Sequence, residues 1–192
     1  MPMERAAGQG EEEIMVTRTI NGVVLTLQEG DITGVQAEAI VNAANSALAG
    51  GGGVDGAIHR AAGPGIMAEC RKLGGCPTGS AKVTSAGNLP AQYIFHAVGP
   101  IYGGQPEDEQ LLRSAYQTCL DLAEQRQVRS MVFPSLSTGA YGYPIALAAP
   151  IALSTMIAHL QKPTSLRQVS FALFGSHAYT AFSKALETLL PE

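Results

Sequence analysis

Two asparagines and one aspartate stand where a short apolar segment gives way to a run of glycines. Asn42 and Asn45 end the apolar stretch 40–45, and Asp55 comes two residues after the glycine run 50–53. Asparagine amides at such positions either stabilise a loop or hold a polar ligand. A carboxylate beside a phosphate-type glycine turn would repel a phosphate. Asp55 is therefore expected either to cap a helix or to face another part of a ligand, as a base or a water anchor.

Two glycine patterns can be compared with known phosphate-binding motifs. A G-x-G-x-x-G pattern over residues 51–56 fits the dinucleotide-binding fingerprint, because it follows a strand and opens a helix. That fingerprint also needs an acid at the end of a second strand about 20 residues further on, whereas the residues that follow here read as helix. A second pattern over residues 74–80 has P-loop spacing, but Ser80 replaces the phosphate-binding lysine, which argues against an ATPase or kinase.

A third glycine-rich segment, residues 135–144, follows an expected strand and precedes an expected helix. Ligands of α/β sheets bind at such positions, and the start of the helix directs free N–H groups toward an anion. Neither this segment nor residues 50–56 contain Lys or Arg. A diphosphate between the two segments would therefore be held by main-chain N–H groups and helix dipoles, in a nest that needs glycine for close approach.

Short apolar runs that alternate with helical patterns must position these residues. The dipeptide Asn21-Gly22 predicts an antiparallel hairpin formed by residues 16–20 and 23–27. Further runs are too apolar to face water and predict buried strands over residues 39–43, 81–85, 93–98, 131–134 and 169–174. Helices are expected over residues 54–61, 64–73, 107–125, 144–160 and 179–190. This order predicts α/β layering, with a kink or a late start of the fourth helix at Pro150.

Length, charge and composition exclude several classes of protein. The chain has 192 residues, of which 46% are hydrophobic and 15% charged, so disordered, collagen-like and coiled-coil proteins are excluded. A net charge of -4 argues against nucleic acid or anionic lipid as a partner. The uncharged, mostly apolar stretch over residues 143–158 is shorter than the roughly 20 apolar residues that a membrane-spanning helix needs. We expect no contact with a membrane.

The N-terminal residues and the cysteines favour a cytoplasmic protein. Residues 1–13 carry four glutamates, three of them consecutive at 11–13, and no apolar run, which predicts a flexible acidic tail ahead of a single domain over residues 14–192. The four histidines show neither H-E-x-x-H nor paired-cysteine spacing, so no metal site is expected. The odd number of cysteines without a C-x-x-C pair predicts buried thiols in a reducing compartment: Cys70, Cys76 and Cys119.

Five segments together resemble the macrodomains, and most of all the MacroD-type ADP-ribosyl hydrolases, which include the bacterial O-acetyl-ADP-ribose deacetylases. The segments read GDIT, IVNAAN, GGGGVDGAIH, AVGP and STGAYG, in the order and spacing of the family, at residues 30–33, 40–45, 50–59, 97–100 and 137–142. The likeness runs from about Thr26 to the C-terminus. It implies a three-layer α/β/α macrodomain with a mixed, mostly parallel central sheet and an ADP-ribose cleft at the strand ends, to which this sequence adds the N-terminal antiparallel hairpin.

The resemblance assigns ligand contacts by position. Asp31, which on local sequence alone can cap a turn, would accept from the adenine amino group, with the Ile32 backbone beside the base. Phe174 would stack on adenine, the alternative being a core phenylalanine that ends a strand. The two glycine-rich loops would enclose the diphosphate and the distal ribose, which Tyr141 would cover. The expected ligand-binding residues are Asp31, Ile32, Asn42, Gly50, Gly51, Gly52, Gly53, Val54, Ser137, Thr138, Gly139, Ala140, Tyr141, Gly142 and Phe174.

Asn45 and Asp55 match the catalytic positions of the hydrolytic members, whereas members that only read ADP-ribose often lack the aspartate. The resemblance implies that Asn45 orients the distal ribose, while Asp55 and a phosphate oxygen position or deprotonate a water. That water would attack either the ester or the anomeric carbon. The expected function is a bacterial, monomeric ADP-ribose-binding hydrolase that needs no cofactor. Its expected partners are ADP-ribose, O-acetyl-ADP-ribose and proteins that carry mono-ADP-ribose on acidic side chains.

Two other classes of function stay open from the sequence. A non-catalytic reader module would bind ADP-ribose without turning it over. A nucleotide-dependent oxidoreductase is favoured only by the glycine fingerprint at residues 51–56. Loss of turnover without loss of ADP-ribose binding on replacement of Asp55 would separate the hydrolase from the reader.

Overall fold

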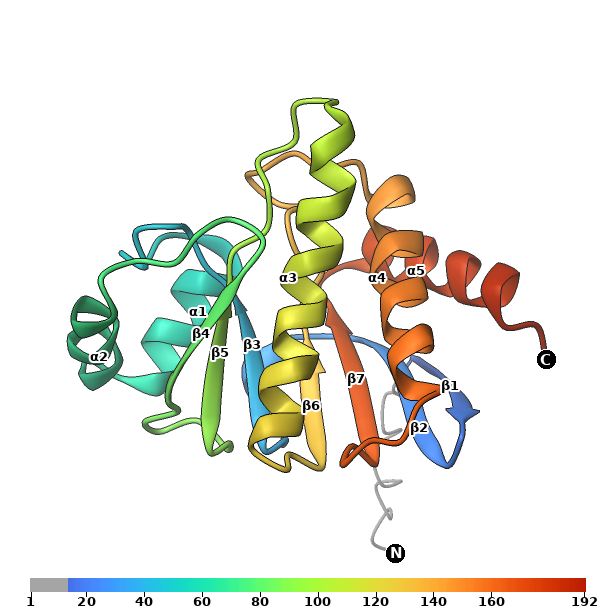
Figure 1. The fold of residues 1–192 in the computed structure, drawn as a ribbon, viewed down its shortest axis with the longest axis horizontal. Coiled ribbons are helices and arrows are strands. Elements are labelled where there is room, and N and C mark those ends of the chain that lie inside the picture. Colours follow the sequence, from blue (N-terminus) through green and yellow to red (C-terminus); the bar gives the residue numbers. More distant parts are fainter. Residues whose placement is uncertain (1–13) are drawn as a thin grey trace, which may run out of the picture.

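A mixed sheet of seven strands forms the centre of the protein (Figure 1). The computed structural model describes residues 14–192, so the expected tail, residues 1–13, lies outside the described residues. The strands are β1 (Met15–Ile20), β2 (Val23–Glu29), β3 (Ala39–Ala43), β4 (Ala81–Ser85), β5 (Tyr93–Ala97), β6 (Ser130–Phe133) and β7 (Gln168–Leu173). The helices are α1 (Gly53–Ala62), α2 (Gly65–Leu73), α3 (Pro106–Gln125), α4 (Ile145–Leu160) and α5 (Ser176–Leu189), with a short 3-10 helix, η1, over Ile32–Gly34.

The order of the strands is β1-β2-β7-β6-β3-β5-β4. The five inner strands are parallel to one another, whereas β1 and β4 run antiparallel at the two edges. The predicted hairpin of β1 and β2 is confirmed, and Asn21 and Gly22 both have positive φ, at 49° and 82°. Two positive φ angles in a two-residue turn suit the right-handed twist of the strands, which is why Asn-Gly is favoured there.

Helices cover both faces of the sheet, which confirms the three-layer α/β/α fold. One core lies between the sheet and α3, α4 and α5, and contains the stacked rings of Phe133 and Phe171, with centroids 5.5 Å apart. The second core lies between the sheet and η1, α1 and α2. Ile40 and Val41 are neighbours on β3 that point to opposite faces, yet both are fully buried. Burial on both faces explains why the inner strands read as continuous apolar runs.

Several element boundaries differ by one to three residues from the sequence-based expectation, most of all the start of α5, at Ser176 instead of Tyr179. Helix α4 begins at Ile145, one residue after the expected start, and runs through Pro150, so of the two alternatives at Pro150 the late start is wrong. Proline removes the N–H that would bond to the carbonyl four residues earlier, at Ala146, and both residues are exposed, so water can satisfy that carbonyl. Strand β7 ends at Leu173, one residue early, because Gly175 turns the chain with a φ of 93° and α5 begins at once.

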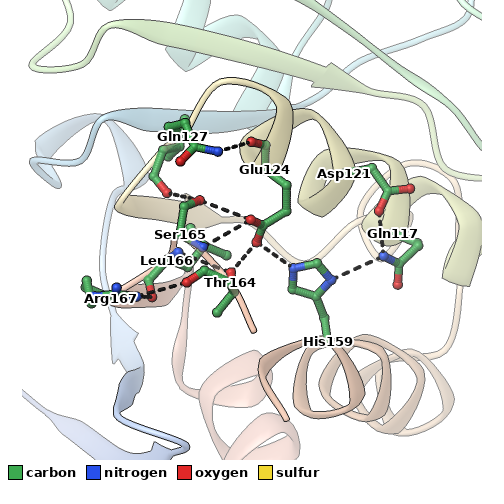
Figure 2. Close-up of polar contacts among 10 residues, drawn as sticks. Gln117, Asp121, Glu124, Gln127, His159, Thr164, Ser165, Leu166 and Arg167 are labelled. Atoms are coloured by element: carbon green, nitrogen blue, oxygen red, sulfur yellow. Dashed lines mark hydrogen bonds and ion pairs between the residues drawn. The ribbon is translucent and has the colours of Figure 1, made fainter. Parts of the chain in front are cut away.

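The carboxylate of Glu124 joins three segments on the side of the sheet covered by α3 and α4 (Figure 2). It accepts from the Ser165 N–H at 3.0 Å and from the Thr164 hydroxyl, and lies 3.0 Å from His159 Nε2 on α4. Burial raises the pKa of Glu124, but these hydrogen bonds outweigh that effect and hold the pKa below its ordinary value of 4.5. The ionised carboxylate therefore stabilises the folded state.

Replacing Glu124 with glutamine should lower the free energy of unfolding by about 1–2 kcal/mol at neutral pH, since hydrogen bonds to an ionised acceptor are lost. Because the pKa of Glu124 is lowered in the folded state, its ionised carboxylate stabilises the fold above pH 4.5. This stabilisation is lost as the pH falls through the folded-state pKa, so the difference in unfolding free energy between wild type and Glu124→Gln should shrink in that range. Urea unfolding at several pH values measures this. The exposed Glu109–Arg113 pair is the control: Glu109→Gln should change stability by about 0.5 kcal/mol or less. An equal effect of both variants would contradict the assigned role of Glu124.

Other sequence-based expectations concern membranes and thiols. In the part of the chain that the structure describes, no helix is long and apolar enough to cross a membrane. The three cysteines are free and buried, as predicted: Cys70, Cys76 and Cys119.

Candidate functional site

The carboxyl ends of the five parallel strands meet at one edge of the sheet, at the top of Figure 1. Across this edge, in the order of the strands, come Asp31 after β2, Phe174 after β7, the loop 135–144 after β6, and the segment with Asn45 and Asp55 after β3. Neighbouring strands lie about 4.8 Å apart, so the line from β2 to β3 spans about 14 Å. The parallel topology thus gathers residues from distant parts of the sequence.

A cleft of about 370 Å³ lies at the β3 and β6 end of this edge. Volumes of this order are typical of small-molecule sites. Its walls come from the loops after β3, β5 and β6 and from the start of α1. The lining residues are Ala43, Ala44, Asn45, Gly51, Gly52, Gly53, Val54, Asp55, Gly99, Ser135, Leu136, Ser137, Gly139, Ala140 and Tyr141.

The start of α1 is open toward the cleft. Gly52 is the N-cap and has no side chain that could accept from the first N–H groups of the helix. Those N–H groups and the positive end of the helix dipole can therefore bind an anion. Close packing also fixes Gly56, because a β-carbon there would lie 2.6 Å from the Gly51 carbonyl oxygen. Arg60 lies one turn further along α1, and its guanidinium comes near Gly56. It thus places a cation close to the glycine run, although neither glycine-rich segment contains Lys or Arg.

The loop after β6 forms the opposite wall. Ser137 has a φ of 66°, and its carbonyl accepts from the Tyr143 N–H at 2.9 Å, which folds the loop back on itself. The Tyr102 N–H donates to the Tyr141 carbonyl at 2.9 Å and ties this loop to the one after β5. A β-carbon on Gly99 would collide with the Ser137 hydroxyl, so any other residue there would force the Ser137 side chain to move. The wall is thus held by main-chain bonds and close packing.

Asp55 combines burial with a defined orientation. It is the third residue of α1 and is 6% exposed. Its Oδ1 accepts from Asn42 Nδ2 at 2.8 Å and lies 3.3 Å from His59 Nε2. Oδ2 lies on the side of Gly51, 3.5 Å from where a β-carbon on Gly51 would stand. One oxygen is therefore held by the protein, and the other is free to interact with a molecule in the cleft.

A buried chain of polar groups supports Asp55 from below. Asn42 is fully buried, and its Nδ2 lies 3.1 Å from His96 Nδ1. Since the Asn42 amide nitrogen can only donate, His96 Nδ1 accepts and Nε2 carries the hydrogen, 2.8 Å from the Thr84 hydroxyl. Burial, with His59 nearby, lowers the pKa of His96 to about 4, so its ring is neutral. Asn42 is therefore not in the cleft wall; it orients Asp55.

Asn45 shapes its own loop and also faces the cleft. Its Nδ2 donates to the Gly50 carbonyl at 2.9 Å, and its Oδ1 accepts from the Ala49 N–H at 3.1 Å. These bonds fix the turn that leads into the glycine run. The loop-stabilising role considered from the sequence is present, and the residue still lines the cleft.

Asp31 and Phe174 lie together at the β2 and β7 end of the edge, where the Gly30 N–H donates to the Leu173 carbonyl. Asp31 caps η1, as its Oδ1 accepts from the Thr33 N–H at 2.9 Å and from the Thr33 hydroxyl at 2.8 Å. These two bonds hold the pKa of Asp31 below its ordinary value. Phe174 is 83% exposed, so the alternative of a core phenylalanine is wrong. An exposed ring beside a carboxylate suits a flat, polar-edged ligand.

The sequence as a whole decides the family. A family model described as Macro domain matches residues 41–152, more than half of the chain. The chain belongs to the macro domain family. The family resemblance and the fold predicted from the five motifs are thereby confirmed.

Similar macrodomains carry informative names. O-acetyl-ADP-ribose deacetylase 1 of Pantoea vagans is 47% identical over 167 residues, covering 84% of this chain and 98% of its own. ADP-ribose glycohydrolase MACROD2 of Xenopus laevis is 44% identical over 187 residues, which are 96% of this chain and 44% of its own length. The Oceanobacillus iheyensis macrodomain solved with ADP matches with a TM-score of 0.90 at 40% identity, covering 94% of this chain and 98% of that one. A variant of that macrodomain was solved with ADPR.

The expected site residues of this macrodomain fall into three groups. Ten of them line the cleft: Asn45, Gly51, Gly52, Gly53, Val54, Asp55, Ser137, Gly139, Ala140 and Tyr141. Gly50, Thr138 and Gly142 lie in the same two loops outside the lining, and Asn42 lies beneath. Asp31, Ile32 and Phe174 form a separate group at the other end of the strand edge, where the Ile32 side chain is buried in the core.

Sequence reasoning missed five lining residues: Ala43, Ala44, Gly99, Ser135 and Leu136. Gly99 lies in the AVGP segment, so its motif was visible but its contact with Ser137 was not. The polar chain through His59 and His96 was also missed, because its members come from α1 and β5 and share no spacing.

Proposed function

We propose that this macrodomain binds ADP-ribose along the carboxyl edge of its sheet and hydrolyses the bond between the distal ribose and an acyl group. The order of groups along that edge supports the proposal. Adenine would lie at Asp31 and Phe174, the diphosphate between the glycine run and the loop after β6, and the distal ribose at Asn45 and Asp55. The names of relatives that act on ADP-ribose or its O-acetyl derivative agree with this substrate class.

The single observation that carries catalysis is the geometry of Asp55. Its carboxylate is buried, is oriented through Oδ1 by Asn42, and presents Oδ2 on the cleft side. In the proposed reaction Oδ2 orients or deprotonates a water, which attacks either the acyl carbon or the anomeric carbon. The bond to the leaving oxygen breaks, and the proton passes to that oxygen, so that an acid and free ADP-ribose are formed. Water is the attacking molecule, and no cofactor takes part.

The diphosphate would be stabilised chiefly by the protein main chain. The uncapped start of α1 and the folded-back loop after β6 both line the cleft, and their backbone N–H groups would bind the phosphates. Asn45 would orient the distal ribose, and Tyr141 would cover it. These residues bind and position the substrate, while Asp55, together with a phosphate oxygen, handles the attacking water.

The experiment that tests the proposal uses two substrates and one product. Purified protein is incubated with O-acetyl-ADP-ribose and, separately, with protein ADP-ribosylated on glutamate, and free ADP-ribose is measured over time. Release from either substrate at a rate proportional to enzyme concentration is expected. Tight binding of ADP-ribose with no release from either substrate would contradict the hydrolase and leave a reader module.

Asn42→Ala should reduce kcat by about 10–100-fold, because it removes a hydrogen bond to the catalytic carboxylate worth about 1.5–3 kcal/mol. The KM should change less, since Asn42 does not line the cleft. Steady-state kinetics on O-acetyl-ADP-ribose separates the two parameters. The control is Asn88→Ala, an exposed asparagine in the turn between β4 and β5, which should leave both unchanged. A rise in KM with unchanged kcat would contradict the orienting role of Asn42.

A further inference from the structure

A cluster of metal-ligating side chains lies beneath the cleft, behind Asp55, and does not line the cleft itself. His59 of α1, Cys70 of α2 and His96 of β5 each place one ligand atom so that all three atoms lie within 4.8 Å of one another. Cys70 and His96 are 1% exposed, and the His59 side chain is 15% exposed. Three separate elements supply the cluster, so no spacing in the sequence reveals it.

The identity and the geometry of these atoms suit one class of metal. Two imidazoles and one thiol are the ligands that Zn²⁺ and related thiophilic divalent ions prefer. In a tetrahedral zinc site, bond lengths of 2.3 Å to sulfur and about 2.05 Å to nitrogen give a nitrogen–sulfur separation of about 3.6 Å. Cys70 Sγ and His96 Nε2 lie 3.8 Å apart, close to that value. The fourth position of such a site is open to a water.

We propose that His59, Cys70 and His96 form a binding site for a thiophilic divalent metal ion of the zinc class, and that its occupation disables Asp55. Metal binding does not depend on the proposed function, whereas the loss of turnover rests on it. The ion would enter past His59, which is the least buried member of the cluster. It acts as an inhibitor of the hydrolase, not as its cofactor.

The protons of the three ligands must be rearranged when the metal binds. Cys70 binds as the thiolate and releases one proton to solvent. His96 Nε2 carries a hydrogen in the metal-free protein, so the ring must change tautomer and hold that hydrogen on Nδ1 instead. Nδ1 then becomes a donor that faces Asn42 Nδ2, which is also a donor. Two facing donors cannot bond, so the Asn42 amide has to turn over.

The side chain of Asn42 is suited to this exchange and transmits it to Asp55. Among residues 14–192, its Oδ1 is buried without a hydrogen-bond partner, so turning the amide gives this atom the His96 Nδ1–H as a donor. The same rotation removes the Nδ2 donor from Asp55 Oδ1, 2.8 Å away, and replaces it with an oxygen. The carboxylate loses its orienting bond and faces a repelling atom. Metal binding and catalysis therefore exclude each other.

Titration of the reduced, metal-free full chain with Co²⁺ tests the site directly. A tetrahedral site with a thiolate ligand gives a thiolate-to-cobalt charge-transfer band and intense visible bands, and Zn²⁺ should displace the cobalt. One Co²⁺ per chain is expected. Cys70→Ser should abolish the charge-transfer band. It should also weaken cobalt binding by at least 10–100-fold, because loss of a residue that only hydrogen-bonds to a metal ligand already has an effect of that size. Cys76→Ser, which removes a buried thiol outside the cluster, should keep both.

A second variant, His59→Gln, keeps the test decisive if Cys70→Ser does not fold. His59→Gln changes the half-buried ligand and should also weaken cobalt binding at least tenfold in a protein whose circular dichroism matches wild type. Absence of the bands in folded wild type, or their persistence in Cys70→Ser, would overturn the site. In the turnover assay, saturating Zn²⁺ should slow wild type at least tenfold relative to Mg²⁺, with each variant compared with its own metal-free rate. If zinc-loaded wild type retained full turnover, the proposed inhibition would be wrong, although the proposed metal site would stand.

Discussion

Asp55→Ala should lower the rate of ADP-ribose release by about 10²–10⁴-fold, the usual contribution of a positioned acid–base group. Binding of ADP-ribose should persist, because the carboxylate handles the water and makes no favourable contact with the anionic diphosphate. Single-turnover release of ADP-ribose and isothermal titration of ADP-ribose measure the two quantities separately.

Asp108→Ala is the matched control for this substitution. Asp108 is also the third residue of a helix and is also buried, at 7% exposed, but its Oδ2 caps α3 by accepting from the Gly103 and Gln105 N–H groups. Its loss should lower the free energy of unfolding by about 1 kcal/mol without abolishing turnover. Near-normal turnover in Asp55→Ala, or an equal loss in both variants, would contradict the assignment of Asp55 as the catalytic group.

Gly139→Val should weaken ADP-ribose binding by at least tenfold, or about 1.4 kcal/mol. Gly139 lines the cleft, and a β-carbon there would meet no protein atom within 4 Å. The added side chain would therefore occupy space in the cleft that the ligand needs, without displacing any atom of the protein. Isothermal titration and thermal unfolding should show a large loss of affinity with a nearly unchanged Tm.

Gly65→Val separates this effect from a general intolerance of valine. Gly65 begins α2, has no positive φ and also has open space around its α-carbon, but it does not line the cleft. Its variant should bind ADP-ribose as wild type does. Equal affinity of wild type and Gly139→Val would mean that the ligand does not lie between the loops after β3 and β6.

The elements of the fold were predictable because each carries a local physical signal. The hairpin turn at Asn21-Gly22 needs two positive φ angles, and the apolar run of β3 is buried on both faces of the sheet. The effect of Pro150 on α4 was harder to predict. Pro150 normally ends or bends a helix, but its position on an exposed face lets water replace the lost bond, and only the packing of α4 reveals that exposure.

Glycine turns and polar residues at strand ends could also be found from the sequence, but the direction of their side chains could not. Asn42 and Asn45 are three residues apart, yet Asn45 faces the cleft and Asn42 lies beneath it, bonded to Asp55. The close approach at Gly99 involves Ser137, far along the chain. Such contacts depend on the parallel packing of β3, β5 and β6, which local patterns do not specify.

The central claim is that main-chain groups after β3 and β6 hold the diphosphate while Asp55 faces the distal ribose. A crystal structure of Asp55→Ala with ADP-ribose tests it most directly, because the substitution prevents turnover and leaves the cleft walls intact. Electron density should place the phosphates between residues 51–53 and 137–142, adenine between Asp31 and Phe174, and the distal ribose at Asn45. A nucleotide bound elsewhere, or reversed along the edge with adenine at Asn45, would contradict it.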